Sequence, residues 1–176
     1  NPATFLIVII LQFGLVIFLS ARITKLSANA ARAAFMAYAV TIGITLSAIF
    51  LAYTSTSIMR VFFITGSMFL IMAIVGYLTK MDLSKFGGIL LMGLVGVIIA
   101  TIVNIFLQSN GLQLAVSYIG VAIFLGLTAY DIQKIKKLYA QFGSAGNLAV
   151  LGALSLYLDF LNLFLFLLRI FGSGRD

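Results

Sequence analysis

The sequence predicts an all-α bundle of membrane-spanning helices, and three observations lead to that fold class. Hydrophobic residues make up 63% of the 176 residues and charged residues only 9%. Soluble domains have about 45–50% apolar and about 25% charged residues, so a soluble single-core fold is excluded. The apolar residues also form long runs that approach or exceed the roughly 20 residues a helix needs to cross a bilayer. No run shows the alternating pattern of a transmembrane β-barrel strand, so helices are the only spanning structure left.

We expect a single transmembrane domain over residues 1–176, with six spans. A first run ends at basic residues beginning with Arg22, and a third run ends before Lys80. The fourth and fifth runs are separated by Asn110-Gly111, which is a turn signal, and their glycine and alanine residues suit close helix packing. After the fifth run, residues 132–139 can continue as an amphipathic helix toward a loop at 143–146. The predicted spans are Pro2–Ala21, Ala33–Tyr53, Val61–Thr79, Phe86–Gln108, Leu112–Asp131 and Asn147–Phe171.

The distribution of basic residues predicts how the bundle is oriented. Eight of the eleven lie on the first, third and fifth connections. The net charge of +7 does not indicate nucleic-acid binding, because the basic residues fall between the apolar runs and not along one face. These connections are therefore assigned to the cytoplasm, and with six spans both termini would lie outside it. A chain that begins outside needs an upstream segment to be inserted, so we expect a further N-terminal helix and seven spans in the native protein.

The residue types that are absent narrow the chemistry. The chain has no Cys, no His and no Glu, which removes thiolate chemistry, iron–sulfur clusters and the usual histidine base, metal ligand and pH switch. Its four acidic residues are all Asp. Asp82 lies in a short basic connection and Asp176 ends the chain, which leaves Asp131 and Asp159 in or beside apolar spans. Carboxylates at membrane depth are costly, so they pair, bind a proton or line a polar path.

Asp131 and Asp159 are the candidate site. Ser155 and Asn162 share one helix face with Asp159, and Tyr130 is adjacent to Asp131, so polar groups surround both carboxyls. If the two carboxyls meet in a low-dielectric site, they cannot both ionise at low cost and would share a proton. Calcium, which takes 6–8 oxygen ligands, would compete with that proton for the same oxygens. The pair therefore indicates a pH-gated cation site, with Asp131 and Asp159 as tentative calcium ligands.

One geometric condition applies to this meeting. Asp131 ends the predicted fifth span, whereas Asp159 lies twelve residues into the sixth, about 18 Å along a helix axis. They meet only if the fifth helix extends past the membrane boundary or the sixth begins short of it.

At these residues the chain resembles the bacterial branch of the Bax inhibitor-1 family of membrane proteins. The similarity covers essentially the whole chain and is carried by Gly126-Leu-Thr-Ala-Tyr-Asp131, Ser155-Leu-Tyr-Leu-Asp-Phe-Leu-Asn-Leu-Phe164 and Leu168-Arg-Ile-Phe-Gly172. The resemblance implies seven helices with the last one central, a location in the bacterial inner (plasma) membrane, and a pH-sensitive calcium leak. It implies that Asp131 and Asp159 act as the proton sensor. It also implies a basic latch that pairs with them in the closed state, for which Arg22 is the nearest equivalent and Lys25 and Arg32 are rivals.

Other readings of the two aspartates remain open. Asp131 and Asp159 could form a structural polar pair that joins two helices, or they could belong to an intramembrane aspartyl protease. Such proteases carry Gly-x-Gly-Asp, but Leu156 and Leu158 occupy those glycine positions here, and there is no Walker-type phosphate loop. We therefore expect no enzymatic activity and no cofactor, with the bilayer, calcium and protons as partners. The alternative function is a non-conducting regulator or substrate of a membrane protease or stress pathway, with a membrane-protein partner.

Overall fold

The computed structural model describes residues 16, 18–19, 21–22, 25–143 and 146–174, and this part of the chain is helical without a named strand. The named elements are α2 (Ala28–Leu46), α3 (Ile49–Ala52), α4 (Ser55–Leu78), the 3₁₀ turn η1 (Leu83–Phe86), α5 (Gly87–Leu107), α6 (Asn110–Phe142) and α7 (Gly146–Phe171).

Five helical segments of the described chain are long and apolar enough to cross a membrane. They correspond to the second to sixth predicted spans, so the all-helical prediction is confirmed for them. The predicted span Pro2–Ala21 lies almost wholly outside the described residues, and a bundle of six or seven spans stays a prediction.

Helices α2, α4 and α6 begin earlier than hydropathy predicts, and a polar side chain caps the first turn of each. Ser27 Oγ accepts a hydrogen bond from the Ala30 N–H at 3.2 Å, so α2 begins at Ala28 and not at Ala33. Thr54 caps α4 and Ser109 caps α6 in the same way. A cap satisfies a backbone N–H that has no partner within its helix, whereas hydropathy registers only the apolar residues that follow.

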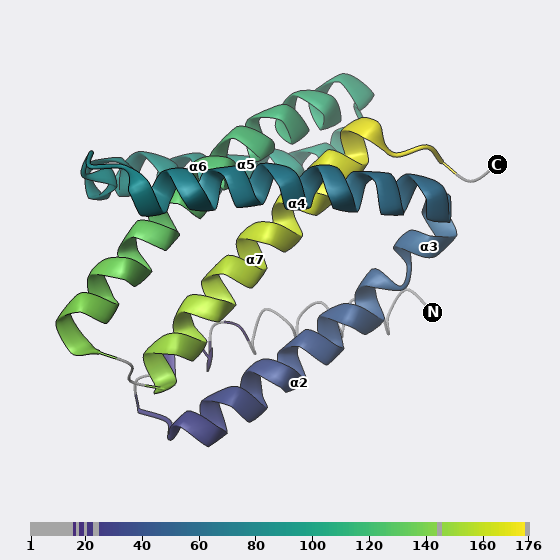
Figure 1. The fold of residues 1–176 in the computed structure, drawn as a ribbon. Helices are drawn as coiled ribbons and strands as arrows, with labels where there is room; N and C mark the ends of the chain where they lie inside the picture. The colour runs from purple at the N-terminus through teal and green to yellow at the C-terminus, as the bar shows by residue number, and fades with distance from the viewer. Residues whose placement is uncertain (1–15, 17, 20, 23–24, 144–145, 175–176) are drawn as a thin grey trace.

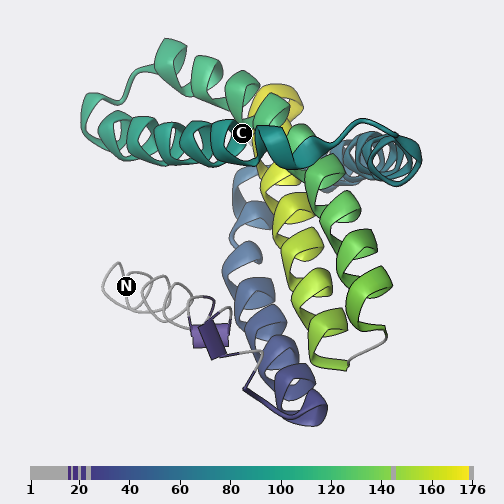
Figure 2. The same ribbon diagram turned by 90° about the vertical axis from the view of Figure 1, so that its left-hand side faces the viewer.

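The helices pack around two hydrophobic cores, and α7 contributes to both. Figure 1 shows α7 crossing obliquely between α2 on one side and the group of α4, α5 and α6 on the other, and Figure 2 shows the same division from the side. One core joins α4, α5 and α6 to the C-terminal half of α7. The other joins α2 to the N-terminal half of α7. Among the five long helices α7 has the largest buried share, in keeping with the central position expected for it.

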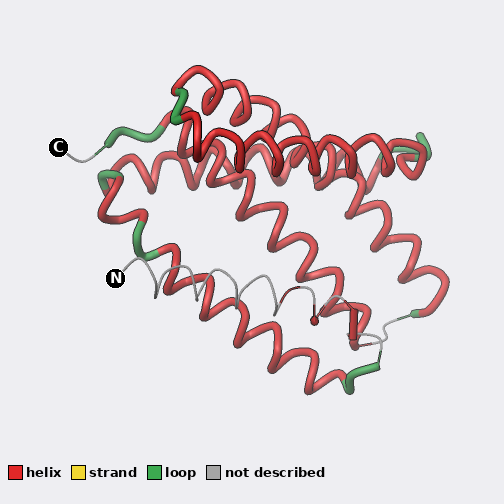
Figure 3. Tube along the Cα trace, turned by 180° about the vertical axis from the view of Figure 1, so that it is seen from behind, coloured by secondary structure: helices red, strands yellow, loops and turns green. Residues whose placement is uncertain are grey.

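The C-terminal tail is held to the connection between α3 and α4. Tyr53 and Gly174 form an isolated antiparallel bridge, and the Thr54 N–H donates to the Ser173 carbonyl at 3.2 Å. The Ser173 N–H donates to Ser57 Oγ at 2.9 Å. Figure 3 shows this loop and the described part of the tail at one end of the molecule, away from the end of α6 and the start of α7.

The longest element is α6, which continues eleven residues past the end of the predicted fifth span. Its 33 residues measure about 50 Å, against a hydrocarbon core of about 30 Å, so more than a third of the helix projects beyond the core or accommodates tilt. The helix ends at Gly143, whose φ of 67° and ψ of −158° lie in a region that is essentially open to glycine alone.

Candidate functional site: an aspartate pair and the connection beside it

Asp131 and Asp159 are brought together because they lie at nearly equal distances from the turn that joins α6 and α7. Asp131 precedes the end of α6 by eleven residues, and Asp159 follows the start of α7 by thirteen. At 1.5 Å per residue these arms are about 17 Å and about 20 Å long, and the helices run antiparallel. The extension of α6 beyond the predicted span therefore supplies the geometry that the pairing requires.

Aromatic contacts on both sides of Asp159 fix the rotation of α7. The Tyr157 ring packs edge-on against Phe35 and Tyr38 of α2, with centroid distances of 5.7 and 6.3 Å. The Phe160 ring packs against Phe62 and Phe69 of α4, at 5.6 and 5.5 Å. Because α2 and α4 pack against the two faces of α7 on either side of Asp159, the Asp159 side chain is directed toward α6.

The side chains of Asp131 and Asp159 lie within interaction range of one another. A hydrogen bond between the two carboxyls requires that one of them carry a proton, because an ionised carboxylate only accepts. Asp159 is 5% exposed, and its Oδ2 has no hydrogen-bond partner among the described residues. Asp131 is half-buried and is acted on electrostatically by Lys134, one helical turn further along α6. The arrangement can hold a proton and leaves one buried carboxyl oxygen available to a ligand.

The pair does not by itself form a complete metal site. No group of three or more potential ligands of the His, Cys, Asp or Glu type occurs in the part of the chain that the structure describes. Two carboxyls supply at most four oxygens, whereas Ca²⁺ takes 6–8. The pair therefore supplies only part of the oxygen ligands that a bound Ca²⁺ takes.

The three polar neighbours predicted for the pair take different positions. The Asn162 side-chain amide donates to the Leu158 carbonyl of its own helix at 2.8 Å. Ser155 is half-buried on α7, one turn before Asp159. Tyr130 turns to α5, where a Cβ added to Gly87 would lie 3.0 Å from its hydroxyl oxygen.

The basic residues considered as a latch do not pair with the aspartates in this structure. Among the described residues the only ion pair is that between Lys137 and Asp82. Arg22 is exposed, as are Lys25 and Arg32. The Arg32 guanidinium lies near the start of α7, 3.9 Å from the position of a Cβ at Gly146. The assignment of Arg22 as the latch stays a prediction.

Gln133, to which the sequence analysis assigned no role, connects α6 to the α4–α5 connection. It is 7% exposed, its Nε2 donates to the Met81 carbonyl at 2.8 Å, and its Oε1 accepts from the Leu83 N–H at 2.8 Å. Both hydrogen-bonding ends of one buried amide are thus used by backbone about 50 residues earlier in the chain. The sequence feature that could have indicated this role is an uncharged amide side chain among the apolar and basic residues that follow Asp131.

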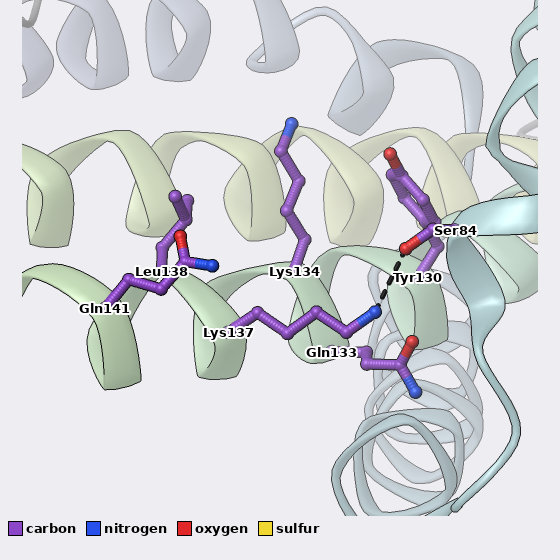
Figure 4. A pocket seen from close by; sticks show the side chains of 7 residues that line it. All are labelled: Ser84, Tyr130, Gln133, Lys134, Lys137, Leu138 and Gln141. Carbon is purple, nitrogen blue, oxygen red and sulfur yellow. Dashed lines mark hydrogen bonds between the residues drawn. The ribbon is translucent and has the colours of Figure 1, made fainter.

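Two lysines of the next turn add to this attachment. Lys137 Nζ lies 2.6 Å from Asp82 Oδ1 and 3.0 Å from Ser84 Oγ, the second contact being drawn in Figure 4. Lys136 Nζ donates to the Tyr77 carbonyl at 2.8 Å and lies 4.5 Å from the centre of the Tyr77 ring. The hydrogen bonds from Lys137 and Ser84 lower the pKa of Asp82 to about 2. The third and fifth connections therefore meet at one end of the bundle, as expected if both lie on the same side of the membrane.

Comparisons with known proteins identify membrane proteins that are similar to this chain. A family model described as inhibitor of apoptosis-promoting Bax1 matches residues 1–176. The chain is 52% identical to the inner membrane protein YbhL of Escherichia coli, over 95% of the chain and 74% of that protein. It is 41% identical to an uncharacterized membrane protein of Streptococcus pyogenes, over 91% of the chain and 71% of the relative.

Proposed function

Because the chain belongs to the Bax inhibitor-1 family of membrane proteins, we propose that it is a passive, pH-sensitive calcium leak of the bacterial inner membrane. The observation that carries the proposal is the close approach of the Asp131 and Asp159 side chains between α6 and α7, where Asp159 is buried. The location is taken from YbhL, whose name describes an inner membrane protein.

The proposed gate is an exchange between one proton and one cation at the aspartate pair. When the pair holds its proton, a carboxylic acid on one helix donates to the carboxylate on the other, so the pair carries one negative charge and fewer charged oxygens face a passing ion. When the proton leaves, two negative charges in a poorly solvated site repel one another and attract Ca²⁺. The buried Oδ2 of Asp159 supports this role, because it is a strong acceptor with no described partner of its own.

Loss of the proton also bears on helix packing. The pair lies where α7 passes from the core shared with α2 to the core shared with α4, α5 and α6. Repulsion at this point acts between α6 and α7 and is opposed by the aromatic contacts of Tyr157 and Phe160. In the proposed mechanism a basic side chain, with Arg22 as the first candidate, pairs with the deprotonated aspartates and restores the closed state.

The test is calcium flux into proteoliposomes that contain the full chain, measured from pH 6 to pH 8. The wild type is expected to show a flux that changes with pH, and Asp159→Asn should flatten the change because one titrating group is removed. Asp82→Asn is the matched control, since it removes an exposed carboxyl that already pairs with Lys137 outside the site.

Two results would contradict the proposal. Unchanged pH dependence in Asp159→Asn would refute the shared proton. The absence of flux in folded wild type would refute the leak and favour a non-conducting regulatory protein, in which the aspartates only join two helices.

A further inference from the structure

A polar cavity lies beside the attachment of α6 to the α4–α5 connection, and the aspartate pair does not line it. It has a volume of about 220 Å³ and is lined by Ser84, Tyr130, Gln133, Lys134, Lys137, Leu138 and Gln141. This exceeds several-fold the roughly 30 Å³ that one water occupies in the liquid, so a phosphate group with its water fits.

The groups around the cavity are hydrogen-bond donors suited to an anion. Figure 4 shows Lys134 and Tyr130 extending to the same side of α6, while Lys137 reaches across to Ser84. The Gln133 amide is used by Met81 and Leu83, and the Lys137 ammonium by Asp82 and Ser84. The other polar groups of the lining are the Lys134 ammonium, the Tyr130 hydroxyl and the Gln141 amide.

The charge of the surroundings is strongly positive. Five lysines lie on the connection and on this part of α6, and Asp82 is the one acidic residue of the connection. Its carboxylate already pairs with Lys137. The half-buried Asp131 is the other carboxyl nearby, one turn before Lys134. The five lysines are Lys80, Lys85, Lys134, Lys136 and Lys137.

The cavity also lies at the depth of a lipid headgroup. A helix needs about 20 residues to cross the hydrocarbon core, so α6, which begins at Asn110, leaves it near residue 130. Every α6 residue of the cavity lies in the part that follows, from Tyr130 to Gln141, and Ser84 lies just beyond the end of α4. Basic pockets between transmembrane helices at the cytoplasmic surface are typical sites for anionic headgroups.

We propose that this cavity binds the phosphate of an anionic phospholipid, with Lys134 as its cationic contact, while Lys137 stays paired with Asp82. The same chemistry would accept a free phosphate, but the position at the membrane boundary favours the lipid. The inference is independent of the proposed leak, because binding is measured without ion flux.

The experiment is native mass spectrometry of the full chain in detergent, with phosphatidylglycerol or phosphatidylcholine of the same acyl chains added. Wild type is expected to retain phosphatidylglycerol in preference to phosphatidylcholine. Lys134→Gln should weaken retention of phosphatidylglycerol about fivefold, the effect of one lysine near an anionic surface. Lys134→Arg keeps the charge and the donors and should keep the lipid. Lys136→Gln is the matched control, because it removes the same charge two residues away at a position that does not line the cavity.

Three results would overturn the assignment. The first is equal loss of phosphatidylglycerol in Lys134→Gln and Lys136→Gln, which would indicate general surface charge. The second is no preference of the wild type for the anionic lipid. The third is Lys134-dependent binding of inorganic phosphate that displaces phosphatidylglycerol, which would assign the cavity to a soluble anion.

Discussion

The attachment of α6 to the α4–α5 connection through Gln133 gives the sharpest prediction about stability. Replacing Gln133 by Ala removes both hydrogen bonds at once and leaves the Met81 carbonyl and the Leu83 N–H without their partners. We expect the connection to open more often and the bundle to unfold more readily, while the fold itself is retained.

The magnitude follows from the exposure of the groups left behind. A protein hydrogen bond contributes about 1 kcal/mol net, and a buried unsatisfied group costs about 1–3 kcal/mol. Met81 is exposed and Leu83 is half-buried, so water replaces part of what is lost. We therefore expect a destabilisation of about 2 kcal/mol. Gln133→Glu should also weaken the attachment, because its carboxylate still accepts from Leu83 but meets the Met81 carbonyl as a second acceptor.

Hydrogen exchange of the Leu83 amide is the direct assay, combined with unfolding of the detergent-solubilised protein. In Gln133→Ala the amide should exchange faster and the unfolding free energy should fall. Gln141→Ala, an exposed glutamine two turns further along α6, should change stability by no more than about 0.5 kcal/mol. Unaltered exchange at Leu83 in Gln133→Ala would show that the amide does not hold the connection.

Two further predictions concern the same helices. Because hydrogen bonds lower the pKa of Asp82 to about 2, from an ordinary value of 3.8, its contact with Lys137 stabilises the fold above about pH 4, and this contribution is lost as the pH falls toward 2. Thermal unfolding between pH 5 and pH 2 should therefore fall more steeply in the wild type than in Asp82→Asn, and parallel curves would argue against the contact. Gly76→Ala should destabilise by about 1–3 kcal/mol, since its Cβ would overlap the Ala129 backbone on α6. Gly66→Ala on the same helix meets nothing within 4 Å, so equal thermal stability of the two variants would contradict this packing.

Much of the described fold could be predicted from the sequence because hydropathy reports directly on membrane spans. The second to sixth spans were located by their apolar runs, and the continuation of α6 toward Gly143 followed from its amphipathic pattern. The helix starts were less accurate: α2 begins five residues before the predicted Ala33, because Ser27 caps it among small residues of modest hydropathy. The break between α2 and α3 was also missed, and the Ser47 hydroxyl donates there to the Ile44 carbonyl at 2.6 Å.

The candidate site shows a different limit. Asp131 and Asp159 were identified because an acidic residue in or beside an apolar run can be recognised from the sequence alone. Gln133 was not, because its partners are one backbone donor and one backbone acceptor about 50 residues away, and no side-chain pattern marks such backbone groups. Tyr130 was placed beside Asp131 by sequence adjacency, yet successive residues on a helix point about 100° apart, and its ring lies over Gly87 instead.

The nearly equal arms of the α6–α7 hairpin determine where the chain tolerates a change of length. A residue inserted at the turn after Gly143 lengthens only the connection, so Asp131 and Asp159 keep their relative height and rotation. A residue inserted between Asp131 and Phe142 displaces one carboxyl by about 1.5 Å and turns it by about 100°, which directs it away from its partner. Epitopes and reporter tags for this protein therefore belong at the turn, and the eleven- and thirteen-residue arms are best left at their natural length.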